Sequence, residues 1–593
     1  MFPFTHFKKA PLTLLSTVLL CCLSLCIPGK AAEDAPAKQN QTADRGALFR
    51  DGNYAMFIHW GAYSEMAGRW KGKTYYGVGE WLMSPYLAKI PVDEYKEAVS
   101  QFNPQKFNAE AIAKLAKAAG MRYIVITSKH HDGFSMFASK ASKFNIVDHT
   151  PFKRDPMKEL AEACRKEGLG FGFYYSQFQD WTTPGGGGGP KQDASGQAVT
   201  FDQYFKEKCV PEVNQLTTEY GPITLIWFDT PGNMSREYSK QLVDLVHKNQ
   251  PGAFVSSRVG NGLGDYDTLG DMELVEQNRT GLWESIDVSN DSWGYVWYGE
   301  NWKSAKDILK FTISTVARGG TFMFNIGPTG EGEVPEPNQL ALENAGKRIA
   351  AYPQLIYKAE ASPWGQALPW GDAVVNDGKI FLAIYDLPSS GKLYLPGMRN
   401  VKVTGLNLLT EASKSALSHE QKNDWTIITL PSKRYDKLLT VVEMTVDDIA
   451  KIEPAQAVDP QIRTILTADS AKTENCKKRK LSWMEKFGEW KHAQQVENLG
   501  PDAYSRWEID IAEPGYYKAH LAYKGKGRLV WKIETDEGIS IQNQQGSSSI
   551  FHEFPIGSIR FDKTGKHIIS VSLLEGDSKS VGLKSLILEP MEI

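Results

Sequence analysis

The sequence predicts a multidomain α/β plus all-β protein, a (β/α)8-like TIM barrel followed by two β-sandwich domains. Its 593 residues exceed what one hydrophobic core usually organises. From residue 47 to 357, stretches with helical periodicity alternate with short apolar runs, which is typical of parallel strands joined by helices. From residue 358 onward, short alternating segments are separated by Gly, Pro, Asn and Asp, which indicates antiparallel sheets.

The N-terminal residues read as a targeting segment. Lys8 and Lys9 precede the apolar run Leu12–Leu25, so residues 1–32 are predicted to be a signal peptide of a secreted or periplasmic protein. Residues 33–46 are polar without periodicity and are predicted to be a flexible leader. A membrane span needs about 20 apolar residues, and no second run of that kind follows, so we expect no membrane span.

The barrel, residues 47–357, is predicted from a first strand at Tyr54–Ile58 and from repeated pairs of a helix and a strand. The pairs are Ala109–Ala119 with Arg122–Thr127, Pro156–Lys166 with Gly170–Tyr175, Tyr204–Tyr220 with Ile223–Phe228, Ser239–Asn249 with Ala253–Ser257, and Ala305–Ala317 with Thr321–Asn325. A region of this length fits a closed barrel better than an open sheet. No Gly-rich dinucleotide fingerprint opens any of these helices.

Two β domains are predicted after the barrel. Residues 358–448 are expected to form a β-sandwich, and residues 449–463 a polar linker. Residues 464–593 are expected to form a second β-sandwich, a candidate carbohydrate-binding module with weak similarity to such modules around Trp507. A purely structural accessory domain is the alternative.

Charge and cysteine content narrow the partners. The formal net charge is -3, so nothing favours a nucleic acid partner. Outside the predicted signal peptide the cysteines are Cys164, Cys209 and Cys476, too widely spaced for a disulfide framework or a metal knuckle. Cys164 and Cys209 fall in helical patterns and are predicted to be buried free thiols.

Polar residues at the ends of barrel strands are the candidates for chemistry, because barrel active sites form there. Asp229 directly follows Ile226–Phe228 and is a candidate nucleophile; an N-cap or turn role beside Thr230–Gly232 is the alternative. His130 and His131 follow another strand. Adjacent residues of an extended chain point to opposite faces, so these histidines suit hydrogen bonds to hydroxyl groups better than metal binding.

Further candidates are less specific. His59 directly follows the first strand. Arg258 directly follows the strand that ends at Ser257, and there it could keep a nearby carboxylate ionised; a surface ion pair is the alternative. A second acid is expected between Asp265 and Tyr298, and Glu284 lies there in an aromatic setting that could keep it protonated. A solvated loop residue is the alternative. The run Gly185–Gly189 is predicted to be a flexible loop, since it lacks the ending of a phosphate loop.

Taken together, seven separated motifs resemble glycoside hydrolase family 29, the α-L-fucosidases, over residues 47–447. They are His59-Trp60-Gly61, Glu80-Trp81, Lys129 to Phe134, Tyr174-Tyr175-Ser176, Trp227-Phe228-Asp229, Trp283-Glu284 with Ser292 to Tyr295, and Asn325 to Pro328. The resemblance implies a barrel followed by a β-sandwich, a retaining mechanism, and no metal or organic cofactor. It implies a retaining exo-acting enzyme that removes terminal α-L-fucose from oligosaccharides or polysaccharides through a covalent glycosyl-enzyme.

The resemblance also implies residue roles. Asp229 looks like the nucleophile and Glu284 like the acid/base, with Glu273 in reserve. The residues that look like the sugar pocket are His59, Glu80, Trp81, His130, His131, Tyr174, Trp227, Arg258 and Trp293. Two other functions stay open: an exo-glycosidase for another deoxy or related sugar, and a non-catalytic sugar-binding protein.

Overall fold

The computed structural model describes residues 47–431, 436, 438–454 and 456–591. The predicted signal peptide and leader, residues 1–46, lie outside this range. Within it, no helix combines the length and the apolar character that a membrane crossing requires. The thiols of Cys164, Cys209 and Cys476 are free, and the first two are buried, as predicted.

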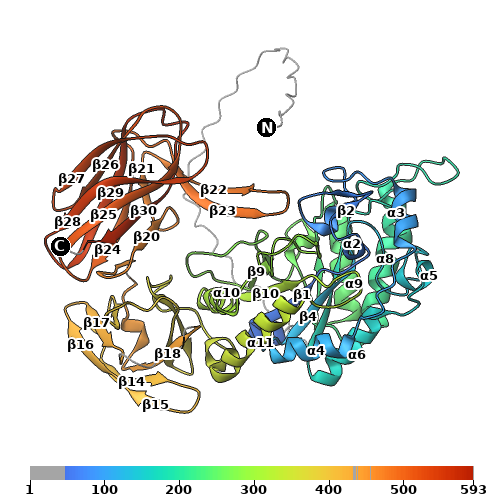
Figure 1. Ribbon diagram of the computed structural model, residues 1–593, viewed down its shortest axis with the longest axis horizontal. Coiled ribbons are helices and arrows are strands. Elements are labelled where there is room, and N and C mark those ends of the chain that lie inside the picture. Colours follow the sequence, from blue (N-terminus) through green and yellow to red (C-terminus); the bar gives the residue numbers. More distant parts are fainter. Residues whose placement is uncertain (1–46, 432–435, 437, 455, 592–593) are drawn as a thin grey trace, which may run out of the picture. The chain divides into compact units, whose positions relative to one another are not determined.

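The N-terminal part of the described chain is a closed barrel of parallel strands (Figure 1). The strands are β1 (Tyr54–Ile58), β4 (Tyr123–Lys129), β5 (Gly170–Tyr175), β6 (Leu225–Phe228), β7 (Phe254–Val255), β8 (Asp267–Thr268), β9 (Trp283–Val288) and β10 (Thr321–Ile326). Their order in the sheet is β7-β6-β5-β4-β1-β10-β9-β8. The two end strands meet where the Ser257 amide donates to the Tyr266 carbonyl at 3.1 Å and the Asp265 amide donates to the Val255 carbonyl at 2.8 Å. The predicted barrel is confirmed.

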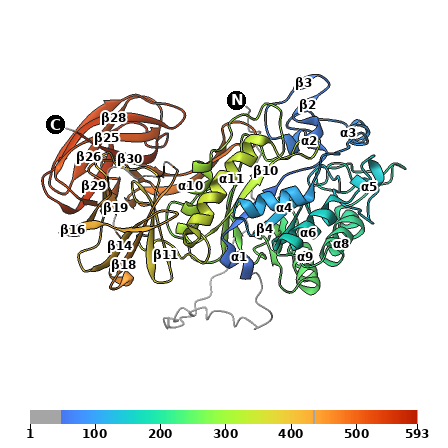
Figure 2. The same ribbon diagram turned by 60° about the horizontal axis from the view of Figure 1, so that its bottom comes forward.

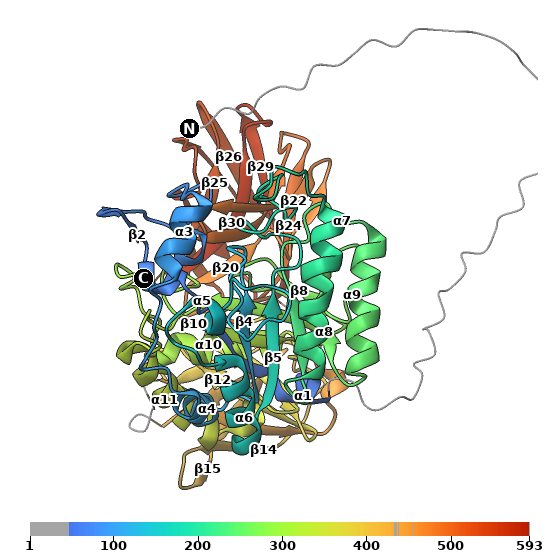
Figure 3. The same cartoon turned by 90° about the vertical axis from the view of Figure 1, so that its right-hand side faces the viewer.

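Helices cover the outside of the strands (Figures 2 and 3). They are α1 (Ala47–Gly52), α2 (Tyr63–Met66), α3 (Val92–Val99), α4 (Ala109–Ala118), α5 (Ile146–His149), α6 (Pro156–Glu167), α7 (Phe201–Tyr204), α8 (Val210–Thr218), α9 (Arg236–Asn249), α10 (Ala305–Ala317) and α11 (Glu336–Ala351), with the π-helical turn η2 (Phe205–Cys209) between α7 and α8. Side-chain caps fix where several begin. The Asn108 carboxamide accepts from the Ala111 amide, and Ser304 and Asp307 form a capping box.

The chain from β7 to β9 departs from the repeating pattern. Between Val255 and Trp283 it forms only the 3-10 turn η3 (Ser257–Val259) and the two-residue β8. Without covering helices these residues form a long connection beside the strand ends, and Asp271 and Glu273 lie in it. β9 has the sequence WESIDV, whose polar residues interrupt any apolar run, and the sequence analysis did not predict it as a strand.

Alternate residues of the strands point into the barrel. Phe57, Tyr174, Trp227 and Ile286 belong to a buried interior cluster that is separate from the larger core between strands and helices. Large aromatic side chains therefore fill the barrel below the strand ends. The candidate site lies at the strand ends, directly above this packed interior.

The first β-sandwich packs a five-stranded sheet, β11-β12-β18-β14-β15, against a three-stranded sheet, β13-β17-β16. The strands are β11 (Gly371–Asn376), β12 (Lys379–Ile384), β13 (Lys392–Leu395), β14 (Val403–Leu409), β15 (Lys414–Ala416), β16 (Ser418–Lys422), β17 (Trp425–Thr429) and β18 (Thr440–Val446). Its core is buried and apolar, with Trp364, Trp370 and Trp425 among its largest members.

The second β-sandwich is built from two six-stranded sheets. One contains β19 (Gln456–Val458), β21 (Lys472–Glu474), β24 (Tyr504–Ile511), β26 (Leu529–Thr535), β27 (Ser540–Gln545) and β29 (Gly565–Glu575); the other contains β20 (Thr464–Thr467), β22 (Lys477–Met484), β23 (Trp490–Glu497), β25 (Gly515–Lys524), β28 (His552–Phe561) and β30 (Gly582–Pro590). The Trp507 side chain is fully buried and its Nε1 donates to the Thr467 carbonyl at 2.8 Å. This tryptophan is therefore a core residue and not an exposed sugar platform.

The segment 449–463, predicted as a linker, is structured. It contains the 3-10 turn η5 (Ile449–Lys451) and strand β19, and Ile452, Ala457 and Val458 are buried. The polar residues that suggested a linker alternate with these apolar ones, which pack between the two sandwiches. The two β domains consequently meet through a packed segment.

Candidate active site

Asp229 lies at the C-terminal end of β6, and its carboxylate is held from several sides. Tyr174 Oη donates to Oδ2 at 2.9 Å, and Arg258 Nη1 donates to Oδ1 at 3.0 Å. His131 Nε2 lies 3.4 Å from Oδ2. Burial alone would raise the pKa of Asp229, but the His131 contact and the Arg258 charge lower it below its ordinary value. The side chain is therefore an oriented, ionised carboxylate, and it caps no helix.

A cavity opens at this end of the barrel. Its lining residues are Phe57, His59, Glu80, Trp81, His130, Trp227, Asp229, Arg258, Asp271, Ile286 and Trp293. Most of the predicted pocket residues are thus brought together, while Tyr174 and His131 contact Asp229 without lining the cavity.

Arg258 joins two carboxylates. Its Nη1 binds Asp229, and its Nη2 donates to Asp271 Oδ1 and, at 3.0 Å, to the Leu269 carbonyl. The guanidinium also lies over the Trp227 ring, 4.7 Å from the centroid. Arg258 is largely buried, so the alternative of a surface ion pair does not apply. Because one planar group binds both carboxylates, Asp229 and Asp271 are held as near neighbours.

His59 and His130 are neutral hydrogen-bonding groups at the cavity wall. Asn325 Nδ2 donates to the Trp293 carbonyl at 2.8 Å, which leaves its Oδ1 to accept from His59 Nδ1 at 2.7 Å. His59 Nε2 is then an acceptor in the neutral ring. Burial lowers the pKa of His59 to about 4 and that of His130 well below its ordinary value. His130 stacks on Tyr174, with ring centroids 5.2 Å apart.

Glu80 and Trp81 enter the cavity from the 3-10 turn η1 (Gly79–Trp81). The Gly294 amide donates to Glu80 Oε2 at 2.8 Å, and the Gly79 amide donates to Ser292 Oγ at 2.8 Å. These bonds tie the turn to the loop that carries Trp293. Burial raises the pKa of Glu80 to about 8, so this carboxyl holds a proton at neutral pH and can donate to a bound hydroxyl.

Glu284, predicted as the acid/base, does not line the cavity. It lies near the start of β9, two residues before the cavity residue Ile286, and a strand rises about 3.3 Å per residue. Its Oε1 accepts from Trp227 Nε1 at 2.6 Å and from Thr268 Oγ1 at 3.0 Å. The Trp227 indole, which lines the cavity, therefore separates Glu284 from it, and this position does not suit the predicted acid/base role.

The reserve candidate, Glu273, also stays outside the cavity. Its Oε1 is paired with Lys480 Nζ, and its Oε2 accepts from the Gly270 amide at 3.0 Å. Asp271, two residues earlier, lines the cavity beside Asp229 and Glu80. The sequence analysis missed Asp271 because no periodic pattern or motif marks it; only its contact with Arg258 across the fold does.

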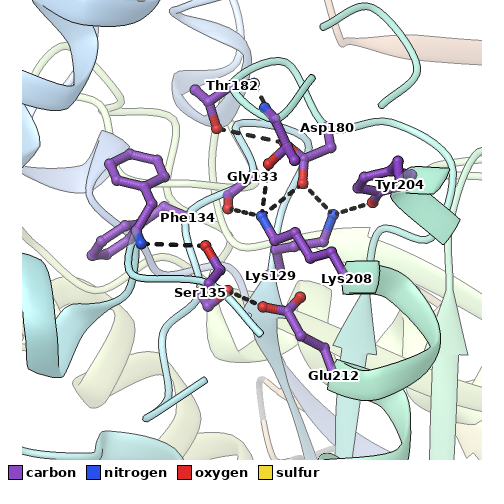
Figure 4. A network of polar contacts seen from close by, with 12 residues as sticks. Lys129, Gly133, Phe134, Ser135, Asp180, Thr182, Tyr204, Lys208 and Glu212 are labelled. Carbon is purple, nitrogen blue, oxygen red and sulfur yellow. Dashed lines mark hydrogen bonds and ion pairs between the residues drawn. The ribbon is translucent and has the colours of Figure 1, made fainter. Parts of the chain in front are cut away.

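A buried network of charges fixes the loop that carries His130 and His131 (Figure 4). Asp180 Oδ2 lies 3.2 Å from Lys129 Nζ and 2.9 Å from Lys208 Nζ. Lys208, in the π-helical turn η2, also donates to the Gly133 carbonyl at 2.8 Å. Burial alone would raise the pKa of Asp180, but the two lysines lower it. Because these charges are paired and hydrogen-bonded, the loop is held rigidly.

The second half of this support comes from the glycine-containing loop between β5 and α7. The Trp181 amide donates to the His131 carbonyl at 2.8 Å, and Thr182 Oγ1 donates to the Asp132 carbonyl at 2.7 Å. A side chain on Gly186 or Gly187 would collide with this loop. The glycine run, predicted to be flexible, is closely packed and allows the loop to fold tightly against the His130–Gly133 turn.

One group of side chains at the site has the composition of a metal site. Among the described residues, ligand atoms of His130, His131 and Asp229 lie within 4.8 Å of one another. However, Asp229 is already bound by Tyr174 and Arg258, and Arg258 brings a positive charge beside it. A cation there would be repelled by this guanidinium, so the donor set fits a polar organic ligand better than a metal.

Comparison with known proteins identifies the family. A family model described as alpha-L-fucosidase matches residues 28–353, which is more than half of the chain. The chain belongs to the α-L-fucosidase family. It is therefore a glycoside hydrolase, as the resemblance implied, and the non-catalytic alternative is set aside.

Relatives of this family span most of the chain. The plasma α-L-fucosidase of Rattus norvegicus is 28% identical over 410 residues, covering 64% of this chain and 84% of that protein. The plasma α-L-fucosidase of Homo sapiens is 27% identical, covering 59% and 78%. The crystal structure of an α-L-fucosidase from Vibrio sp. strain EJY3 is 28% identical, covers 91% of this chain and 97% of that one, and superposes with a TM-score of 0.75.

Proposed function

We propose that this member of the α-L-fucosidase family releases terminal α-L-fucose with retention of configuration, with Asp229 as nucleophile and Asp271 as acid/base. The observation that carries the assignment is the shared Arg258, which binds both carboxylates. Retaining glycosidases need their two carboxyl groups about 5–5.5 Å apart, and inverting ones need about 6.5–9.5 Å. Two acids on one guanidinium fit the shorter separation.

In the first step Asp229 attacks the anomeric carbon, and the bond from that carbon to the glycosidic oxygen breaks. The bonding electron pair goes to the leaving oxygen, which takes a proton from Asp271. The product is an ester between the sugar and Asp229.

In the second step water hydrolyses the ester. Asp271, now ionised, takes a proton from the water molecule, whose oxygen attacks the anomeric carbon as Asp229 leaves with its electron pair. Two displacements at one carbon restore the starting configuration. Asp271 is partly exposed, whereas Glu80, the other acid of the cavity, is almost fully buried; water therefore reaches Asp271 more readily.

The cavity wall offers both polar and apolar partners to a deoxy sugar. His59, His130 and Glu80 can bind ring hydroxyls, while Phe57, Trp227, Ile286 and Trp293 supply apolar surface for a methyl group. An apolar pocket discriminates one methyl group by only about 1–3 kcal/mol. Slow hydrolysis of α-L-galactosides, which have the same ring hydroxyls with CH2OH in place of the methyl group, is therefore expected beside the main activity.

Azide rescue tests the two roles with an activated aryl α-L-fucoside. Asp229→Ala should lose activity and, with azide, form the β-fucosyl azide, because azide then attacks the substrate directly. Asp271→Asn should form the α-fucosyl azide, because azide attacks the glycosyl-enzyme. If Asp271→Asn keeps normal turnover on a poorly activated fucoside, the acid/base assignment is incorrect.

We also propose that the enzyme acts outside the cytoplasm on fucosylated oligosaccharides or polysaccharides. The basic and apolar pattern of residues 1–32 supports export, and a cavity closed below by the packed barrel interior supports exo action. Fractionation of cells producing the full chain tests the first point. A product analysis that finds fucose alone, and never a larger fucosylated fragment, tests the second.

A further inference from the structure

The hairpin formed by β22 and β23 belongs to the second β-sandwich but makes its tip contacts with the barrel (Figure 1). At its tip, the Phe487 ring lies 5.6 Å from the Trp81 ring and 5.9 Å from the Tyr86 ring, centroid to centroid. Phe487 packs against the interior cluster of the barrel and not against the core of its own domain. Phe487 therefore packs on the barrel, although it belongs to the second β-sandwich.

Shape and charge fix the hairpin against the barrel. A Cβ on Gly488, whose φ is +86°, would lie 2.3 Å from the Val78 side chain, so only glycine permits this approach. Lys486 Nζ lies 2.9 Å from Asp291 Oδ1, and Lys480 pairs with Glu273. His492 Nε2 donates to the Asp271 carbonyl at 2.8 Å. The hairpin thus contacts both the turn that carries Trp81 and the loop that carries Asp271.

We propose that the β22–β23 hairpin completes the active site: Phe487, with Trp81 and Tyr86, binds the sugar to which fucose is attached, and His492 positions the loop of Asp271. This inference rests on the proposed function of the cavity. Trp81 lines the cavity and Tyr86 is exposed, and the centroids of the three rings lie 5.6–6.1 Å apart, so this aromatic cluster extends from the cavity to the solvent. Sugar rings have apolar faces that pack on such rings.

The aromatic cluster of Trp81, Tyr86 and Phe487 lies at the mouth of the cavity, through which the leaving group must depart. The cavity is closed below by the packed barrel interior, so the rest of a glycan must project through its mouth. Asp271, which is proposed to protonate the leaving oxygen, is held by the same hairpin. Because the hairpin contacts both the proton donor and the aromatic cluster, it is placed to bind the leaving sugar and not fucose itself.

The first test compares two substrates on Phe487→Ala. α-L-Fucosyl fluoride has no leaving sugar, and the second substrate is the fucosylated disaccharide that the wild type cleaves fastest in a panel of linkages. We expect KM for the disaccharide to rise roughly 3- to 10-fold with kcat little changed, which is the size of one aromatic contact. Turnover of the fluoride should stay within about 2-fold of the wild type.

Two variants control this test. Tyr516→Ala removes another exposed aromatic side chain of the same domain, away from the hairpin, and should change neither substrate. Phe487→Trp keeps a stacking surface and should restore the disaccharide KM. Unchanged disaccharide kinetics in Phe487→Ala would overturn the inference alone, whereas a wild type inactive on the fluoride would overturn the proposed function.

The second test addresses His492 as a positioning residue. His492→Ala removes the donor to the Asp271 carbonyl, so the proton donor is less well placed and kcat for the disaccharide should fall roughly 10-fold with KM little changed. His492→Gln retains an N–H donor and should recover most of kcat. Equal losses in both variants, or a loss confined to KM, would contradict the positioning role.

Discussion

At the residue scale, the assignment of catalytic roles depends on which carboxyl groups line the cavity. The sequence motifs located Asp229, because a polar residue directly after a buried apolar strand is visible in the sequence. They did not locate Asp271, since its role follows from sharing Arg258 with Asp229, and a contact across the barrel leaves no local pattern. Glu284 has an aromatic neighbour, as expected, but that neighbour, Trp227, lines the cavity while Glu284 does not.

Removal of Asp229 or Asp271 should reduce activity far more than removal of Glu284. We expect Asp271→Asn to lower kcat/KM on an oligosaccharide by roughly 10²- to 10⁴-fold, the usual contribution of general acid catalysis. Glu284→Gln should stay within about 10-fold of the wild type, because Gln still accepts from Trp227 Nε1. Steady-state kinetics on one substrate compares the two, and a reversed order would return the acid role to Glu284.

Glu284 should instead affect how stability depends on pH. Burial raises the pKa of Glu284 from 4.5 to about 7, so the folded protein keeps this carboxyl protonated below pH 7. The stabilisation is fully present below the unfolded pKa and is lost as the pH rises through the folded pKa. We therefore expect the wild-type Tm to fall more than the Glu284→Gln Tm between about pH 4.5 and about pH 7. Parallel curves would show that the carboxyl does not titrate in this range.

At the element scale, regular segments were predictable and connections were not. The ranges Tyr54–Ile58, Gly170–Tyr175 and Ala305–Ala317 were predicted with the bounds that the structure has. Their residues are apolar at the spacing of a buried strand or an amphipathic helix. β9 was not predicted because half of its residues are polar. The glycine run was misinterpreted because close packing and flexibility both favour glycine.

The turn after β4 should be intolerant of any side chain at Gly133. Its φ is +78°, and an added Cβ would lie 2.0 Å from Asp180 Oδ1 and 2.5 Å from Thr182 Oγ1. We expect Gly133→Ala to lower the free energy of unfolding by about 2–5 kcal/mol and to displace the histidines. Activity should fall with it. Urea denaturation and fucoside hydrolysis measure the two effects.

Gly196 provides a matched control for that substitution. Its φ is +85°, but no atom lies within 4 Å of an added Cβ. Gly196→Ala should therefore cost only the backbone strain of about 1–2 kcal/mol and leave activity unchanged. Similar losses in the two variants would show that backbone strain, and not the collision with Asp180, determines the cost at Gly133.

At the scale of the whole molecule, the domains depend on one another through packed surfaces that composition alone does not reveal. The predicted linker is a structured, partly buried segment, and Ala457 and Ala512 pack in the core of the first sandwich. Trp425 Nε1 donates to Asp510 Oδ1 at 2.9 Å across the same boundary. Whether a polar segment links two domains or joins their cores depends on partners distant in the sequence.

This boundary should make the two sandwiches unfold together. Asp510→Ala leaves the buried Trp425 N–H without its acceptor, which costs about 1–3 kcal/mol. Because the cores are shared, hydrogen exchange should speed up in β12 of one sandwich and in β26 of the other, by similar factors. In the double variant with Trp425→Phe both partners are absent, no donor is left unpaired, and part of the stability should return. Faster exchange confined to β26 would mean that the sandwiches open independently, and that the hairpin at the active site could detach without disturbing the domain next to it.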